Sequence, residues 1–207
     1  MAKPYVIGID MGGTNTAFGL VDARGTVLAS SSIKTAKHAD INDYIAELHE
    51  AIMRLVEENN AVDKINGIGI GAPNACYYTG VIADGVNLPW PTPIPLADLI
   101  TEKFGIPCVI TNDANAAAIG EMTYGVARGM KDFIMITLGT GVGSGIVING
   151  QVVYGHDGFA GELGHVIMKR TNGRMCGCGR SGCLEAYCSA TGVARTAREF
   201  LEIRTED

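Results

Sequence analysis

A cluster of cysteines near the end of the chain could bind a metal ion. Cys176, Cys178 and Cys183 fall within a stretch of eight residues and have glycines between them, so the backbone can wrap around a cation. His165 lies upstream and completes a Cys₃His set, which is the ligand type and number that Zn²⁺ prefers. Because four protein ligands leave no position open for water, the pattern predicts a structural zinc site. Buried free cysteines and a disulfide are the alternatives.

Acidic side chains at two other places could act on a hydroxyl group. Asn112 and Asp113 stand where a predicted strand passes directly into a predicted helix. They could cap that helix, or Asp113 could accept a proton from a hydroxyl nucleophile. Spacing alone leaves both readings open. Glu162 and Glu185 flank the metal ligands, which would orient both carboxylates; without a metal they are ordinary exposed acids.

Two glycine-rich turns could cradle phosphate groups. Residues 10–16 read DMGGTNT and residues 138–145 read LGTGVGSG. Glycines let backbone N–H groups approach phosphate oxygens, and a carboxylate at a strand end, as at Asp10, suits a hydrated Mg²⁺ ion. Each turn alone could be an ordinary hairpin, but both occupy the same place in a repeated pattern, which favours a two-sided phosphate clamp. Neither turn contains the lysine of a Walker loop.

Composition limits the class of protein. The chain has 207 residues, of which 47% are hydrophobic and 18% charged, so it can form a substantial core. A net charge of -6 argues against a surface that wraps nucleic acid. No run of about 18 apolar residues and no signal-peptide pattern occurs. We therefore expect a cytoplasmic protein that binds neither nucleic acid nor membrane.

The same strand, glycine turn and hairpin pattern occurs twice, near residues 5–30 and 133–154, and this indicates two related α/β halves. We place the division at 1–115 and 116–207. The second half contains no later strand–helix units, so we expect the chain to be the N-terminal part of a longer protein. The predicted strands are 5–9, 17–21, 26–29, 65–70, 108–111, 133–137, 145–148 and 151–154. The predicted helices are 41–60, 96–104, 112–121 and 192–207, and the proline-rich residues 72–95 are predicted to form a structured loop.

Together these motifs resemble the ROK family of sugar kinases and sugar-responsive repressors, and within it most closely the bacterial glucokinases. The matching segments run from residue 10 to residue 185: 10–16, 112–113, GTGVGSG at 139–145, GELGH at 161–165 and CGCGRSGCLE at 176–185. The resemblance implies an α/β fold of the actin-like ATPase (ribonuclease H-like) type, duplicated into two lobes around a cleft, with the second lobe truncated here. Where family members often carry Pro-Gly, residues 72–75 read Ala-Pro-Asn-Ala.

The resemblance also implies cofactors and residue roles. ATP and Mg²⁺ would act on a hexose, Zn²⁺ would be structural, and Asp113 would be the catalytic base that deprotonates the sugar 6-hydroxyl. The residues implied to bind sugar are Gly71, Asn87, Asn112, Asp113, Glu162, His165 and Glu185. The residues implied to bind ATP and its Mg²⁺ are Asp10, Gly12, Gly13, Thr14, Thr16, Gly139, Thr140, Gly141 and Gly143. The metal ligands are His165, Cys176, Cys178 and Cys183, so that His165 would serve both sites.

The function that these expectations favour is ATP-dependent phosphorylation of glucose to glucose 6-phosphate in carbohydrate metabolism. A kinase for N-acetylmannosamine, N-acetylglucosamine or fructose is an alternative, because the same motifs serve those sugars. A repressor is disfavoured, because the family's repressors carry a helix-turn-helix segment before the first phosphate motif and here that motif begins at Asp10. Family members often form homodimers, and we expect the same of the full-length protein.

Overall fold

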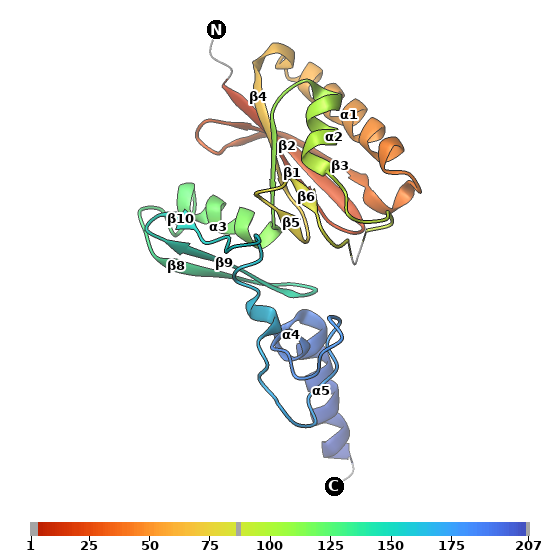
Figure 1. Cartoon of the computed structure of the whole chain (residues 1–207), viewed down its shortest axis with the longest axis vertical. Helices are drawn as coiled ribbons and strands as arrows, with labels where there is room; N and C mark the ends of the chain where they lie inside the picture. The colour runs from red at the N-terminus through yellow and green to blue at the C-terminus, as the bar shows by residue number, and fades with distance from the viewer. Residues whose placement is uncertain (1–3, 86–87, 206–207) are drawn as a thin grey trace.

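Five strands form the first sheet, in the order β3-β2-β1-β4-β7 (Figure 1). The strands β1 (Tyr5–Met11), β2 (Asn15–Asp22) and β3 (Val27–Lys34) make an antiparallel meander, whereas β4 (Ile65–Gly71) and β7 (Cys108–Thr111) run parallel to β1. The computed structural model describes residues 4–85 and 88–205. Because β1, β4 and β7 are parallel, the residues that follow them emerge at one edge of the sheet, where open α/β sheets bind ligands.

Two helices, α1 (Ile41–Glu58) and α2 (Leu96–Phe104), cover one face of this sheet. In β1 every second side chain points into the core beneath them, as the two-residue period of a strand requires, and these buried side chains are Ile7, Ile9 and Met11. The buried residues of α1 recur at three- and four-residue spacing, which places them on the helix face that meets the sheet.

The ends of both helices are fixed by local chemistry. The Asp40 carboxylate accepts a hydrogen bond of 2.7 Å from the Asn42 N–H and so caps the start of α1. Gly105 has a φ of 67°, in the left-handed region that favours glycine, and ends α2. The helix therefore ends at residue 104, as the sequence predicts.

The connecting segments contain short elements that leave no periodic pattern in the sequence. Single turns of 3₁₀ helix occur at η1 (Thr35–Lys37) and η2 (Val62–Lys64). Within the predicted loop 72–95, β5 (Ala75–Cys76) pairs with β6 (Val81–Ile82) as a small hairpin. The sequence did not predict this hairpin, because strands of two residues are too short to show alternation.

A second antiparallel sheet has the order β10-β9-β8 and repeats the meander of the first three strands. It consists of β8 (Phe133–Leu138), β9 (Val142–Ile148) and β10 (Gln151–Val152), the last being shorter than the predicted 151–154. The helix α3 (Asp113–Thr123) packs on this sheet and also touches β4, so it joins the two parts of the molecule. The predicted division between residues 115 and 116 falls inside α3, and it remains a prediction.

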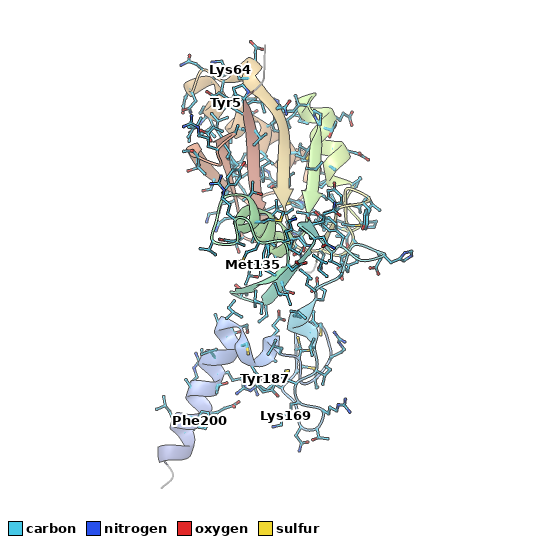
Figure 2. The ribbon with its side chains drawn as sticks, turned by 90° about the vertical axis from the view of Figure 1, so that its left-hand side faces the viewer. Tyr5, Lys64, Met135, Lys169, Tyr187 and Phe200 are labelled. Carbon is cyan, nitrogen blue, oxygen red and sulfur yellow. The ribbon has the colours of Figure 1, made fainter. Side chains whose placement is uncertain are left out.

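The last tier of the structure contains little regular sheet or helix apart from its end. It comprises η3 (Leu163–His165), a loop over residues 166–184, α4 (Glu185–Cys188) and α5 (Ala190–Thr205). Figure 2 shows the order of the tiers along the molecule, with Met135 marking β8 in the middle and Phe200 marking α5 at the far end. Within residues 4–85 and 88–205, no helix combines the length and the apolar character that crossing a membrane requires.

One partly buried arginine attaches α5 to the loop before it. The Arg174 side chain is only 11% exposed, and its guanidinium donates four hydrogen bonds. The acceptors are the carbonyl oxygens of Ala186 (3.2 Å) and Gly192 (3.1 Å), Thr196 Oγ1 (2.8 Å) and Glu199 Oε2 (2.6 Å). A single side chain therefore ties the loop to α4 and to the first three turns of α5.

Candidate functional site

A cavity of about 650 Å³ lies where the two sheets and the last tier meet. Predicted site residues line it from three directions. The edge of the first sheet and the start of α3 contribute Asp10, Gly71, Asn112 and Asp113; the turn between β8 and β9 contributes Gly139, Thr140, Gly141 and Gly143; and the last tier contributes Glu162, His165 and Glu185. Segments that are up to 175 residues apart, from Asp10 to Glu185, thus share one cavity.

The start of α3 presents a carboxylate to the cavity. Asn112 caps the helix, because its Oδ1 accepts a hydrogen bond of 2.9 Å from the Ala114 N–H. Asp113 Oδ1 accepts from the same N–H at 2.8 Å. Both residues therefore bond the start of the helix and also line the cavity, and the role of Asp113 as a proton acceptor stays a prediction.

Two other carboxylates lie close enough to Glu162 to influence its charge. Burial raises the pKa of the Glu162 carboxyl, and the charges of Asp113 and Glu185 raise this pKa further. His165 acts on the same pKa in the opposite direction. A concentration of acidic groups around a cavity that also contains an amide suits a ligand rich in hydroxyl groups, because each carboxylate oxygen can accept a hydrogen bond.

The four predicted metal ligands come together beside this cavity. The ligand atoms of His165, Cys176, Cys178 and Cys183 all lie within 4.8 Å of one another. Cys178 Sγ and Cys183 Sγ are 3.7 Å apart, and Cys176 Sγ is 3.7 Å from His165 Nδ1. In a tetrahedral site with Zn–S bonds of about 2.3 Å, two sulfur atoms lie about 3.8 Å apart, so the arrangement fits a zinc ion.

The alternatives for the cysteine cluster can be judged from the same distances. A disulfide would bring two sulfurs to about 2 Å, whereas all six cysteines of the chain are free. The disulfide alternative is therefore wrong. Cys176 and Cys183 are buried and Cys178 is exposed, so the cluster opens to solvent on one side only.

Four of the predicted phosphate contacts lie outside the lining of the cavity. Gly12, Gly13 and Thr14 form the turn between β1 and β2, where the Gly12 N–H donates to the Asn15 carbonyl at 3.0 Å. Thr16 lies in the interior with no exposed surface.

The hydroxyl of Thr16 already has two partners in the core beside the first sheet. It is 2.9 Å from Thr35 Oγ1 and 2.8 Å from the Tyr44 hydroxyl. The prediction of Thr16 as a residue that faces the phosphates is corrected, because a buried hydroxyl bonded to two core residues cannot reach a ligand. Asn87, a predicted sugar-binding residue, lies outside the described residues.

The cavity also has lining residues that sequence reasoning missed. Pro73 and Asn74 line it next to Gly71. Asn74 has a φ of 52°, and its Nδ2 donates to the Asp84 carbonyl at 2.8 Å, so its amide is held in place. The sequence did contain a signal for Asn74, because it stands where family members often carry the glycine of Pro-Gly. Asparagine is the residue that most readily replaces glycine at a positive φ.

Close packing explains why Gly71 is a glycine. A Cβ at this position would lie 3.2 Å from the Ala116 Cβ on α3, which is tighter than ordinary contact. The small pair Gly71 and Ala116 therefore lets α3 approach the end of β4, and this approach brings Asp113 to the edge of the sheet.

The chain is similar to glucokinases, to an N-acetylmannosamine kinase and to xylose repressors. The sequence pattern of the ROK family matches residues 6–206. The chain is 40% identical to a glucokinase of Halalkalibacterium halodurans, covering 96% of this chain and 61% of that protein. It is 34% identical to an N-acetylmannosamine kinase of Salmonella newport (94% and 65%) and 31% identical to a xylose repressor of Caldicellulosiruptor bescii (98% and 51%).

Among solved structures, the chain resembles a ROK family glucokinase from Streptomyces griseus in complex with glucose and AMPPNP. The TM-score is 0.76 at 35% identity, and the match covers 98% of this chain and 62% of that one. The chain thus spans about three fifths of the length of the glucokinases it matches. This likeness confirms the predicted actin-like α/β fold. With a family pattern that extends over almost all of its residues, the chain belongs to the ROK family.

Proposed function

We propose that the protein carrying this sequence transfers the γ-phosphoryl group of ATP to the 6-hydroxyl of a hexose, with glucose as the preferred acceptor. One observation carries the proposal: Asp113 shares a cavity with the acids of the last tier on one side and with the glycine turn 139–143 on the other. A sugar and a triphosphate could therefore meet beside a carboxylate. The chain's similarity to glucokinases, over about three fifths of their length, supports the same activity.

In this proposal Asp113 accepts the proton of the 6-hydroxyl as that oxygen attacks the γ-phosphorus. The new O–P bond forms while the bond to the bridging oxygen breaks, and ADP leaves with the electron pair. Phosphoryl transfer depends mainly on positioning and on neutralising charge, which the remaining residues supply. Glu162 and Glu185 accept hydrogen bonds from sugar hydroxyls, and His165 donates one from the ring nitrogen that does not bind the metal. Gly71 and Asn112 complete that side.

The glycine turn and Asp10 are proposed to face the triphosphate. The backbone N–H groups near Gly139, Thr140 and Gly141 suit phosphate oxygens, because glycines allow close approach. Asp10, the second-last residue of β1, places an exposed carboxylate in the cavity, a ligand that fits hydrated Mg²⁺. When bound, Mg²⁺ would neutralise charge on the phosphate oxygens. Gly143 lies where the turn joins β9.

Zinc is proposed for the Cys₃His cluster, where it would fix the loop that carries the sugar-binding acids. We also propose the two-lobe division, a cytoplasmic location and a homodimer for the full-length protein. No role in the phosphate site is proposed for Thr16.

A coupled assay of ADP release over a panel of sugars tests the proposal in the full-length protein. We expect turnover with glucose, and a loss of about a thousandfold or more in kcat for Asp113→Asn with little change in glucose affinity. Asp98→Asn is the matched control, because Asp98 also lies in the first turn of a helix, α2, and is outside the cavity. Full turnover by Asp113→Asn would refute the assignment of the base.

The same panel decides between hexoses. The similarity to an N-acetylmannosamine kinase makes that sugar the specific alternative. A higher kcat/KM for N-acetylmannosamine, N-acetylglucosamine or fructose than for glucose would replace glucose as the acceptor. Absence of turnover with every sugar, together with sugar-dependent binding to DNA, would favour a repressor.

A further inference from the structure

The Glu185 carboxylate connects two parts of the site that the sequence treats as separate. Its Oε2 accepts a hydrogen bond of 3.0 Å from the Val142 N–H, and its Oε1 lies 3.5 Å from Cys176 Sγ. Val142 is the first residue of β9 and lies within the glycine turn 139–143. One side chain therefore touches the metal cluster with one oxygen and the proposed phosphate turn with the other.

Other contacts from the last tier hold the same turn. The Ala190 N–H at the start of α5 donates to the Gly139 carbonyl at 2.9 Å. Gly164, in η3, lies so close to the Val142 carbonyl that a Cβ at Gly164 would collide with it. The turn is thus bounded by η3, by α4 and by the start of α5, all of which adjoin the metal ligands.

The backbone that carries Glu185 is itself fixed to the metal cluster. Glu185 follows Cys183 by two residues, and the Leu184 N–H between them donates to the Val166 carbonyl at 2.9 Å. Val166 in turn follows His165. A metal that holds Cys183 and His165 together therefore also fixes the point from which the Glu185 side chain extends.

A glycine turn needs such support. Gly139, Gly141 and Gly143 give the segment the freedom to approach a ligand, but glycine loses more conformational entropy on ordering than any other residue. A hydrogen bond to a charged acceptor is among the stronger ties available to a backbone N–H group. The bond from Val142 to Glu185 is the tie that links this turn to the metal loop through a side chain.

We infer that Glu185 is a positioning residue that transmits order from the metal cluster to the glycine turn 139–143. The inference deepens the proposed function, on which its meaning for catalysis rests. Metal binding then orders the turn proposed to face the phosphates as well as the sugar-binding acids. Two contacts support this statement: the hydrogen bond from the Val142 N–H to the Glu185 carboxylate, and the bond from the Leu184 N–H to the Val166 carbonyl, which holds the backbone of Glu185 beside the metal ligands.

Hydrogen exchange at the Val142 amide, measured by NMR on this chain, tests the inference. Glu185→Ala removes the acceptor, so we expect exchange to become roughly ten- to hundredfold faster, as the loss of a hydrogen bond to a charged group predicts. Glu185→Gln keeps an acceptor oxygen and should restore most of the protection. Glu162→Ala, which removes another carboxylate of the cavity, is the matched control and should leave this amide unchanged. The Ile70 amide in the first sheet reports whether each variant remains folded.

The effect of the metal is measured at the same Val142 amide. Removing zinc with a chelator should speed exchange at Val142 at least about tenfold in the unmodified chain and by much less in Glu185→Ala. Equal exchange in Glu185→Ala and the unmodified chain would overturn the inference, as would Glu185→Gln behaving like Glu185→Ala. Unchanged exchange on metal removal would overturn the link to the metal. If the chain takes up no zinc, the proposed metal site fails, while the Ala and Gln variants still decide the role of Glu185.

Discussion

Replacing Arg174 tests how the last tier of the molecule is held together. The helix α5 has little packing of its own, since Val193, Phe200 and Leu201 are all more than half exposed. Its ties to the preceding loop pass largely through the Arg174 guanidinium, which also lies over the Tyr187 ring at 4.8 Å from its centroid. Arg174→Met keeps the aliphatic length of the side chain and removes these polar ties.

The loss of stability in Arg174→Met can be worked out from the hydrogen-bond partners of the guanidinium. A buried hydrogen bond from a charged donor contributes about 1.5–3 kcal/mol, and losing the donor leaves the Ala186 and Gly192 carbonyls without this partner. The ion pair with Glu199 adds under about 1 kcal/mol, because Glu199 is 46% exposed. These effects are not additive, and we expect Arg174→Met to destabilise the tier by about 3 kcal/mol, which is more than a hundredfold in the opening equilibrium.

Hydrogen exchange of the α5 amides, followed by mass spectrometry, measures this opening directly. Arg195→Met is the matched control, because Arg195 also bonds Glu199, at 2.9 Å, but is 56% exposed. We expect that variant to lose less than about 1 kcal/mol. If the two variants speed exchange equally, the guanidinium of Arg174 is not what holds α5, and the reasoning is refuted.

Three further outcomes follow from the site. Elemental analysis should find one zinc per chain and none in Cys178→Ala; zinc retained by that variant would contradict the ligand set. Gly145→Ala should destabilise the chain by about 1–3 kcal/mol in urea unfolding, because its Cβ would lie 2.6 Å from the Ala118 Cβ. Gly150→Ala separates crowding from backbone strain, because nothing lies within 4 Å of a Cβ added there but φ is +74°. Glu162→Gln should raise stability above the elevated pKa of Glu162, since removing a carboxylate that burial and like charges disfavour helps the folded state. That gain should disappear below the ordinary value of 4.5, where the acid is protonated in both states, and a gain that persists there would contradict the cause assigned to the pKa.

Local patterns were sufficient for most of the secondary structure and for the metal cluster. The helix α2 and strand β7 have the predicted bounds, because a glycine ends the helix and β-branched residues form the strand. The Cys₃His cluster was predictable because three of its ligands fall within eight residues. In so short a segment the spacing in the sequence limits how far apart the three sulfur atoms can lie.

Contacts between distant segments were harder to predict. Thr16 is the cross-strand partner of Met11, and directly paired residues share one face of a sheet, so Thr16 points into the core with Met11. The register of β1 and β2, had it been known, would have shown that the Thr16 side chain points into the core. The place of Asn74 in the cavity depends on a short hairpin and on a positive φ, neither of which leaves a periodic signal.

A structure of the full-length protein with bound glucose would test the central claim most directly. We expect the sugar 6-oxygen within about 2.6–3.2 Å of the Asp113 carboxylate, with the hydroxyls at the other end of the ring bonded to Glu162, His165 and Glu185. Glucose bound elsewhere, or with its 6-oxygen turned toward the metal cluster and away from Asp113, would contradict it.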